Sequence, residues 1–278
     1  MMLEPESTKS KRKCFYKPLP PAFKYFGGKS RERKFIIPII PEHETFTEPF
    51  AGGASVTLGK PPSETEVLGD KRADVINFWR RVKSGKPIQP IRKLSKHEFL
   101  EIREKPEEER TPEEFLALQA NSFGGHGESY ASGSSSTAKK LIENFDAYWH
   151  RLRKTTLLKS DFRDTIRQYN SPETCHYIDP PFMNDLGKYV NYGGHGIPSL
   201  KDLRDTTDQI KGRFILSLPD TPEVRKAFPE SDFHIQVLTL YRPLTSYNKG
   251  PRTRTELLIT NFNPSAPKRW WALEDMEG

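Results

Sequence analysis

Cysteine and long apolar runs are both scarce in this sequence. Its two cysteines, Cys14 and Cys175, lie too far apart to give a metal-ligand spacing, which predicts a reduced, intracellular chain without a bound metal. The longest aliphatic run, residues 35–40, contains a proline and is far too short to cross a bilayer. Residues 1–21 lack the apolar stretch of a signal peptide, so we expect a cytoplasmic protein with no membrane partner.

Acidic residues are outnumbered by basic ones, which gives a net charge of +7 and a pI near 9.2. This excess favours a polyanionic partner, although basic clusters such as those at 9–13 and 242–254 are more often solvated surface. The acidic run at 107–114 is likewise most often solvated surface. The dinucleotide fingerprint G-x-G-x-x-G is absent, which argues against a cofactor that contains a pyrophosphate.

Short apolar runs alternate with helical segments over most of the chain. Such alternation predicts parallel strands joined by helical crossovers, and therefore an α/β fold. The last two apolar runs are joined by a polar loop without a helix, which predicts an antiparallel hairpin at the edge of the sheet. We expect strands at 45–48, 66–68, 155–158, 176–178, 214–218, 233–241 and 256–261, and helices at 73–82, 161–169 and 200–210.

The alternation stops between residues 84 and 150, where the chain is charged and helical and then rich in glycine and serine. We interpret this segment as an inserted helical subdomain with an exposed loop or hairpin at 121–137, although a Gly/Ser-rich stretch can also be a plain linker. Polar and aromatic side chains alternate in the loop, as in a surface that contacts a ligand; they are Ser122, Phe123, His126 and Tyr130. Residues 1–21 are interpreted as a flexible basic arm.

Two stretches place carboxylates after predicted strands. In "FTEPFAGGASV", residues 46–56, a strand ends at Glu48 and a glycine pair lets the backbone approach a ligand, although such pairs most often mark tight turns. Asp70 ends the next strand, where a carboxylate can accept both ribose hydroxyls or can simply cap the following helix.

Three further stretches have residues suited to binding or catalysis. "KYFGGKS", residues 24–30, supplies Lys29 in a loop that lacks the full phosphate-binding pattern. In "KSDFRDT", Asp161 and Phe162 could hold an adenine amine and cover its ring, or could be a helix cap and a core aromatic. In "IDPPF", residues 178–182, a strand runs into a carboxylate, two prolines and an aromatic ring, which is either a strand terminator or a displayed catalytic turn.

In their order, these stretches resemble the Dam-like class of adenine-specific DNA methyltransferases from residue 23 to about residue 262. The motifs that carry the resemblance are "FKYFGGKS", "FTEPFAGGASV", "VLGDKRADVINFW", "LLKSDF", "IDPPF" and "TELLITNF". The resemblance implies a Rossmann-like α/β methyltransferase fold, with a mostly parallel seven-stranded sheet, a terminal antiparallel hairpin and a small helical insertion. It also implies a catalytic domain of residues 22–83 and 151–278 and a target-recognition subdomain at 84–150.

The resemblance further implies S-adenosylmethionine as cofactor, double-stranded DNA as substrate, and roles for individual residues. The catalytic turn would be Asp179, Pro180, Pro181 and Phe182. The cofactor would lie against Tyr25, Phe26, Gly27, Gly28, Lys29, Glu48, Pro49, Phe50, Ala51, Gly52, Gly53, Asp70, Asp161, Phe162 and Asp179. DNA would contact Asn121, Ser122, Phe123, His126, Tyr130, Tyr189, Tyr192 and Arg252. Further expectations are a protein of a prokaryotic cell or one encoded by a virus, an association with the nucleoid, a cognate restriction endonuclease and a monomeric state.

Phe182 departs from the tyrosine that is usual at this position of the family. It keeps a stacking face but lacks the hydroxyl, and phenylalanine also occurs in this turn in some RNA and guanine-amine methyltransferases. One alternative is therefore an RNA methyltransferase on the same fold, which the insertion and "TELLITNF" disfavour. Another alternative is a catalytically silent nucleic-acid-binding module, which the intact turn at residues 179–182 disfavours.

Overall fold

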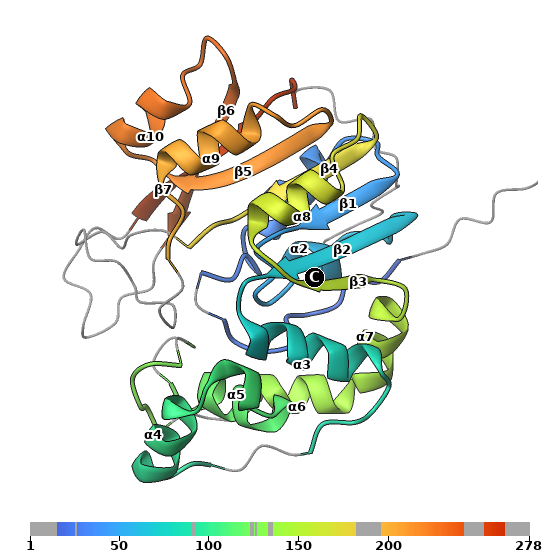
Figure 1. Cartoon of the computed structure of the whole chain (residues 1–278), viewed down its shortest axis with the longest axis vertical. Helices are drawn as coiled ribbons and strands as arrows, with labels where there is room; N and C mark the ends of the chain where they lie inside the picture. The colour runs from blue at the N-terminus through green and yellow to red at the C-terminus, as the bar shows by residue number, and fades with distance from the viewer. Residues whose placement is uncertain are drawn as a thin grey trace, which may run out of the picture.

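A computed structural model describes residues 16–25, 27–89, 93–122, 125, 127–132, 136–181, 196–241 and 253–264, without the side chains of 136–138 and 241. In this part of the chain seven strands form one sheet, in the order β3-β2-β1-β4-β5-β7-β6 (Figure 1). The strands are β1 (Thr45–Glu48), β2 (Thr65–Asp70), β3 (Thr156–Lys159), β4 (Thr174–Ile178), β5 (Arg213–Pro219), β6 (His234–Tyr241) and β7 (Thr253–Thr260). Strands β1 to β5 are parallel, and β7 runs antiparallel between β5 and β6. The predicted mostly parallel sheet with a terminal antiparallel hairpin is confirmed.

Helices lie on both faces of the sheet and below it in Figure 1. They are α1 (Arg33–Ile36), the 3₁₀ helix η1 (Ile37–Ile39), α2 (Ser55–Gly59), α3 (Ala73–Lys83), α4 (Lys96–Glu104), the 3₁₀ helix η2 (Glu107–Glu109), α5 (Pro112–Ala120), α6 (Ser136–Glu143), α7 (Phe145–Leu152), α8 (Phe162–Gln168), α9 (Leu200–Thr207) and α10 (Pro222–Ala227). The three predicted crossover helices are present as α3, α8 and α9. Within the described ranges, no helix combines the length and the apolar character needed to traverse a bilayer.

Two apolar layers enclose the sheet. On one face, strand residues pack against the isoleucines of α1 and η1 and against Val56 of α2; the strand residues are Phe46, Cys175, Tyr177, Ile215 and Leu258. On the other face, strand residues pack with α8, α9 and α10; they are Ile178, Phe214, Leu216, Leu218, Leu257 and Ile259. Burying both faces explains why successive residues of β1, β4 and β5 are buried instead of every second one.

Helices α4, η2, α5 and α6 form a helical group beside α3, away from most of the sheet (Figure 1). Capping boxes at Ser95 and Thr111 start α4 and α5, which accounts for the helices expected from the sequence there. Phe115 of α5 contacts Phe78 of α3 and Phe23 of the N-terminal segment, with ring centroids 5.5 Å and 5.2 Å apart. The group is therefore joined to the sheet domain through α3, and the boundaries of a target-recognition subdomain stay a prediction.

The burial of the His176 imidazole should make the stability of the fold depend on pH. It is fully buried in β4, where its Nδ1 lies 2.7 Å from Thr47 Oγ1 and burial lowers its pKa to about 4 from 6.5. Between pH 6.5 and pH 4, the His176 imidazole is protonated in the unfolded chain but stays neutral in the folded chain. The free energy of unfolding should therefore decrease as pH falls from 6.5 to 4, by up to about 3 kcal/mol from this group. Urea unfolding should show a shallower pH dependence for His176→Asn over this range; equal slopes would contradict the assignment.

Candidate active site

The carboxyl ends of β1 and β4 mark the point where the strand order reverses. In open α/β sheets, ligands bind beside such a switch point. Glu48 is the last residue of β1, and Asp179 directly follows β4, its neighbour in the sheet. The two turns that the sequence singled out are therefore brought to the same edge of the sheet.

Polar side chains gather at the carboxyl end of the sheet face that packs on α1 and η1. Alternation along a strand puts Asp179 on the same face as Tyr177. The strand register adds Ser217 of β5 and Glu256 of β7 to this face. Lys29 comes from the segment that precedes α1 and covers the face.

Lys29 lies at the centre of this polar cluster. Its Nζ is 2.6 Å from Asp179 Oδ1 and 2.9 Å from Glu256 Oε1. The side chains of Lys29 and Glu256 are each 2% exposed, whereas that of Asp179 is 16% exposed. Ser217 donates its hydroxyl to the same Glu256 Oε1 at 2.6 Å. Two carboxylates thus share one buried ammonium, and Asp179 is the member that reaches solvent.

Burial changes the protonation of the acidic side chains at this edge. It raises the pKa of Asp179 to about 6, against the opposing effect of the Lys29 ammonium. Burial likewise raises the pKa of Glu48 to about 7, although Thr57 donates its hydroxyl and its backbone N–H to that carboxylate at 2.6 Å and 3.1 Å. Burial alone would lower the pKa of Lys29, but Asp179 and Glu256 outweigh burial and raise it. At pH 7.5 Asp179 is therefore ionised beside a charged lysine.

The turn after β1 is held by Asp70 and by two aromatic side chains. Gly52 has a φ of +42°, and a Cβ at this position would lie 2.6 Å from the ring of Tyr25. The Gly52 N–H donates to Asp70 Oδ2 at 2.9 Å, and Trp79 donates its indole N–H to the Gly52 carbonyl at 2.9 Å. The other Asp70 oxygen accepts the N–H of Arg72, which is itself the N-cap of α3. Asp70 therefore fixes the glycine turn and is not the cap of α3.

The predicted adenine-binding pair lies at the start of α8. Phe162 is buried and stacks on Phe50, with ring centroids 5.1 Å apart and an angle of 26° between the rings. Asp161 caps α8 by accepting the Arg163 N–H at 3.0 Å, and its carboxylate also pairs with the Arg163 guanidinium at 2.8 Å. The cap and the core aromatic are thus observed, and a part in adenine binding stays a prediction.

Residues of the glycine-rich loop are used inside the protein. Asn121 Oδ1 accepts the Leu94 N–H at 3.2 Å, and Ser122 Oγ accepts the Gly127 N–H at 2.9 Å. Both residues are buried, and Tyr130 donates its hydroxyl to the Leu94 carbonyl at 2.9 Å. In this structure these side chains shape the loop instead of pointing outward, and their predicted contacts with DNA stay predictions.

This loop packs directly on the segment that carries Tyr25. Gly125 has a φ of +78°, and a Cβ there would lie 2.5 Å from the Lys24 carbonyl oxygen. Only glycine allows both the backbone conformation and the close approach. The loop of the helical group and the rim of the candidate cofactor site are therefore in contact.

The remaining predicted residues divide into two groups. Gly27 and Gly28 precede Lys29, and Pro49, Ala51 and Gly53 flank Gly52 in the turn after β1. Pro180 and Pro181 follow Asp179 directly. Outside the described residues lie Phe26, Phe123, His126, Phe182, Tyr189, Tyr192 and Arg252.

Glu256 and Ser217 are not among the site residues predicted from the sequence. In the sequence, Glu256 is a letter of the motif "TELLITNF" and the first residue of a predicted strand. A glutamate at the start of an apolar strand was the available signal, because a buried charge requires a partner. Ser217, in the middle of an apolar strand, gave no comparable signal.

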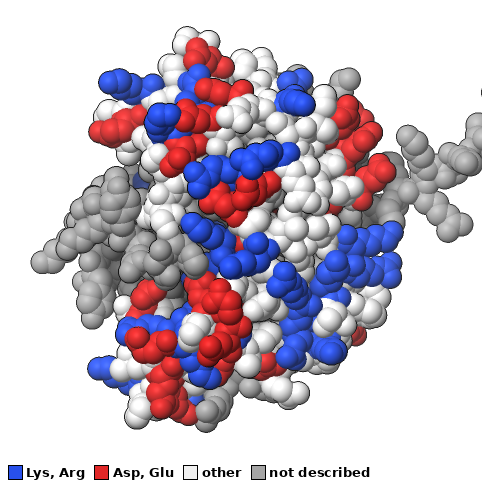
Figure 2. All heavy atoms as spheres, viewed as in Figure 1, with Lys and Arg blue, Asp and Glu red and all other residues white. Residues whose placement is uncertain are grey.

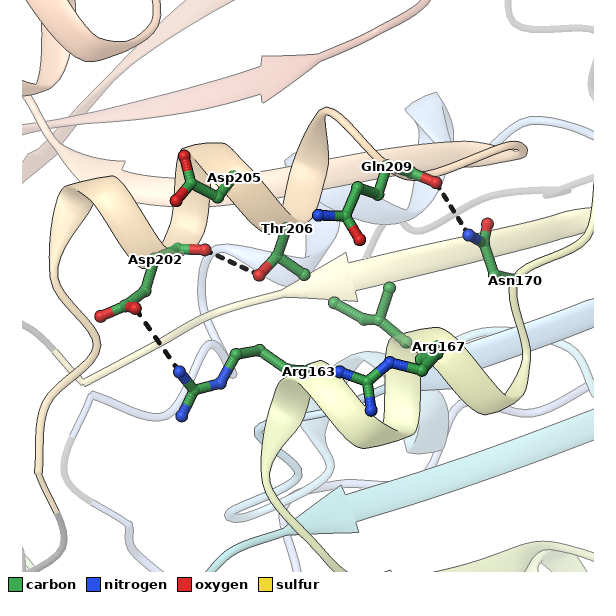
Figure 3. Close-up of a pocket in the computed structure, with 8 residues that line it drawn as sticks. Arg163, Arg167, Asn170, Asp202, Asp205, Thr206 and Gln209 are labelled. Atoms are coloured by element: carbon green, nitrogen blue, oxygen red, sulfur yellow. Dashed lines mark hydrogen bonds and ion pairs between the residues drawn. The ribbon is translucent and has the colours of Figure 1, made fainter.

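A shallow hollow between α8 and α9 is a separate feature of the surface (Figure 3). Arg163 of α8 reaches Asp202 of α9 at 3.4 Å, and Asn170 donates to the Gln209 carbonyl at 2.8 Å. These side chains bridge the two helices, so the hollow has no set of convergent groups for a reaction. Arg163 also holds Asp161, which links the hollow to the start of α8.

Charged side chains are unevenly distributed on the face shown in Figure 2. Acidic groups gather over the helical group around α4 and α5, and basic groups gather over α3 and α7. The acidic run is not only solvated surface, because Glu107 accepts the N–H of Ala73 at 3.3 Å and pairs with Arg72 at 3.2 Å. Part of this run therefore joins the helical group to the start of α3.

Residues 25–242 match the model of the D12 class N6 adenine-specific DNA methyltransferase family. The Type II methyltransferase M.CviBI of Paramecium bursaria Chlorella virus NC1A is 26% identical over 265 residues, which cover 88% of this chain and 100% of that protein. The resemblance inferred from the sequence motifs is thereby confirmed.

Two solved structures have weaker likenesses. An S-adenosylmethionine-dependent O-methyltransferase from Thermotoga maritima has a TM-score of 0.37 and 14% identity, over 83% of this chain and 64% of that chain. An rRNA methylase from Streptococcus thermophilus has a TM-score of 0.36 and 9% identity, over 83% and 93% of the two chains. At these values the likenesses add nothing to the strand order described above.

The family match includes Lys29, the Glu48 turn and Asp179, the residues that meet at the switch point, and it extends over most of the sequence. S-adenosylmethionine, the cofactor predicted from the sequence, is the cofactor of this class. The family match supports a DNA substrate in place of the RNA alternative considered from the sequence. It also supports an enzyme in place of a catalytically silent binding module. The chain belongs to the family of D12 class N6 adenine-specific DNA methyltransferases.

Proposed function

We propose that this chain transfers a methyl group from S-adenosylmethionine to the 6-amino group of an adenine flipped out of a specific site in duplex DNA. The observation that carries the proposal is the Asp179 carboxylate, held 2.6 Å from Lys29 at the switch point between β1 and β4. A specific site and a cognate restriction endonuclease are proposed because the relative with 26% identity is a Type II methyltransferase. A monomeric state and a cytoplasmic location stay predictions.

The residues around the β1 turn fit a cofactor that carries positive charge. Glu48 and Asp70 are buried carboxylates beside a turn in which Gly52 lets the backbone approach closely. Glu48 and the glycine turn would hold the methionine end, Asp70 the ribose, and Asp161 with Phe162 the adenine. When bound, S-adenosylmethionine would supply a methyl group that its positively charged sulfur makes electrophilic.

Asp179 and Pro180 are suited to activate the amino group of adenine. That group is a poor nucleophile, because its lone pair is delocalised into the ring. If the Asp179 carboxylate and the Pro180 carbonyl accept its two N–H bonds, the nitrogen becomes pyramidal and its lone pair is freed for attack. Preorganised acceptors also stabilise the positive charge that develops on the nitrogen. The methylated nitrogen then releases one proton, which a carboxylate with a pKa of about 6 can accept near neutral pH.

Base flipping requires compensation for lost stacking and pairing, at a cost of a few kcal/mol. We assign this role to Phe182, whose ring would recover about 1–3 kcal/mol by stacking on the target base. Tyr189 and Tyr192 would contact the flipped nucleotide, and the helical group with its loop would select the DNA sequence. The contact between Gly125 and Lys24 supports this division, because it joins the loop to the cofactor side of the site.

The test is long-read sequencing of genomic DNA from a methylation-free host that expresses the chain. We expect 6-methyladenine in one short sequence context, and none in a host that expresses Asp179→Ala. Purified protein should transfer labelled methyl groups to duplex DNA and not to structured RNA. Methylation of cytosine only, or of RNA only, would refute the proposed function.

Gly52→Ala should weaken cofactor binding without unfolding the protein. A side chain there would have an unfavourable positive φ and would lie 2.6 Å from the Tyr25 ring, so the turn must move. We expect calorimetry to show at least about a tenfold loss of affinity for S-adenosylmethionine, the equivalent of about 1–2 kcal/mol of strain. Gly85→Ala is the matched control, because Gly85 has the same unfavourable positive φ, +71°, but follows α3 and lies outside the predicted cofactor residues. Equal losses in both variants would contradict the explanation.

A further inference from the structure

Glu256 is a buried carboxylate to which the proposed reaction assigns no role. Its Oε1 accepts the Ser217 hydroxyl at 2.6 Å and lies 2.9 Å from Lys29 Nζ. Its Oε2 makes no hydrogen bond to any residue in the described part of the chain, and the Arg254 guanidinium lies 3.6 Å away. An acidic side chain that is 2% exposed must be stabilised by these neighbours, because burying an ion is costly.

We propose that Glu256, fixed by Ser217, is a positioning residue for the Asp179 carboxylate and acts through Lys29. This inference rests on the proposed role of Asp179 as an acceptor of one N–H bond of the adenine amino group. Lys29 lies between the two carboxylates, so Glu256 competes with Asp179 for one ammonium group. The competition leaves Asp179 ionised but only partly neutralised.

The competition matters because Asp179 must remain a strong hydrogen-bond acceptor. A lysine paired with Asp179 alone would withdraw negative charge from the oxygens that face the target nitrogen. With Glu256 present, two carboxylates surround one ammonium, and the cluster keeps an excess of negative charge. That excess stabilises the positive charge that develops on the adenine nitrogen during attack. Glu256 therefore contributes without touching the substrate.

The groups that face Asp179 set the direction of the expected pH effect. Lys29 lowers the pKa of Asp179, whereas Glu256 and Glu32 raise it. Glu48 and Tyr177 also face Asp179, from β1 and from β4, and Tyr177 stays neutral because burial raises its pKa well above 10. Arg254 pairs with Glu32 at 3.1 Å. Removal of the Glu256 charge should thus lower the pKa of Asp179.

The central experiment uses the nearly isosteric variant Glu256→Gln in the full chain. We expect kcat to decrease by about tenfold or more, as for a misplaced catalytic group. The acid limb of kcat/KM should move to lower pH by about one unit, because a like charge near Asp179 is lost. The same shift should appear without cofactor or DNA, in the carboxyl ¹³C NMR titration of Asp179, assigned with Asp179→Asn. Affinity for S-adenosylmethionine and for duplex DNA should change less than threefold.

Ser217→Ala gives a second, milder variant. It keeps the charge of Glu256 but removes the hydroxyl that fixes it, so the decrease in kcat should be smaller, with little shift of the acid limb. Glu230→Gln is the matched control, because it removes a glutamate charge from an exposed ion pair with Arg225, and neither residue is among the groups that act on the pKa of Asp179. The control should change neither kcat nor the titration. Thermal unfolding of each variant verifies that it is folded at the assay temperature.

Each outcome separates this inference from the proposed function. If Glu256→Gln is folded and leaves kcat and the Asp179 titration unchanged, the positioning role is wrong. If it raises the pKa of Asp179, or mainly weakens cofactor binding, the role is also wrong. If Asp179→Ala keeps the wild-type kcat, the proposed function itself fails, whatever Glu256→Gln does.

Discussion

Asp179→Ala is expected to lower kcat for methyl transfer by at least about 10²–10³-fold, the loss typical when one preorganised hydrogen-bond partner of a transition state is removed. The variant should fold, because Lys29 keeps a second carboxylate partner, Glu256, at 2.9 Å. The loss should appear in kcat, since the lost hydrogen bond strengthens only as charge develops on the nitrogen. DNA affinity should change little, because phosphate contacts supply most of it.

Single-turnover transfer of labelled methyl groups to a duplex with the identified site measures this effect. Asp205→Ala is a suitable control, because it removes an exposed carboxylate of α9 that pairs with Lys201, which is also exposed. The control should retain full activity. Wild-type kcat/KM should also fall below pH 6, because Asp179 becomes protonated there and can no longer accept its N–H bond from the adenine amino group. Activity that stays constant from pH 7.5 to 5 would falsify the assigned role of Asp179.

Glu66→Gln should produce the largest loss of stability among single charge removals in the described residues. Glu66 lies between two cations that are themselves buried. Lys60 Nζ is 2.7 Å from its Oε1, and Arg151 donates to both of its oxygens. Lys60 is 0% exposed and Glu66 is 6% exposed. Breaking a buried ion pair by removal of one partner costs about 3–5 kcal/mol, because the other charge stays buried without compensation.

The pH dependence of this loss has a definite sign. Burial alone would raise the pKa of Glu66, but Arg151 and Lys60 outweigh it and hold the pKa below its ordinary value of 4.5. The stabilisation is therefore fully present above pH 4.5 and is lost as pH falls through the pKa of the folded state. Urea unfolding should show a large difference between wild type and Glu66→Gln at pH 7 that narrows below pH 4. Glu101→Gln, which removes the charge of an exposed glutamate paired with His97, should leave the urea midpoint of unfolding almost unchanged.

Much of the fold could be predicted from local patterns. Runs of β-branched and aromatic residues gave β1, β4 and β5 within one or two residues, and polar capping residues explain the predicted helices α4, α5 and α9. Helix α2 was not predicted, because it has only five residues and follows Ala54 in a left-handed conformation, without a polar cap. Strand β7 begins at Thr253, three residues before the predicted start at 256, because pairing with β6 extends it.

The site was predictable where chemistry follows directly from a motif. Asp179, Lys29, Glu48 and Gly52 were singled out by their positions after strands or in glycine turns, and the structure brings them to one edge. Glu256 and Ser217 could not be placed in the same way. Glu256 reaches Lys29 because β7 pairs with β5, a pairing that no local pattern specifies, and Ser217 meets Glu256 across the same two strands. The role of Asp70 in fixing Gly52 likewise depends on a contact between neighbouring strands.

The insertion of β7 between β5 and β6 has a consequence for the order in which the enzyme matures. During synthesis, β1, β2 and β4 leave the ribosome before β7, so the part that would hold the cofactor can assemble first. Lys29 then has Asp179 as a carboxylate partner but lacks Glu256. We expect a nascent chain at this stage to bind the methyl donor but to methylate DNA slowly. Full activity is expected only after the hairpin of β6 and β7 has paired with β5.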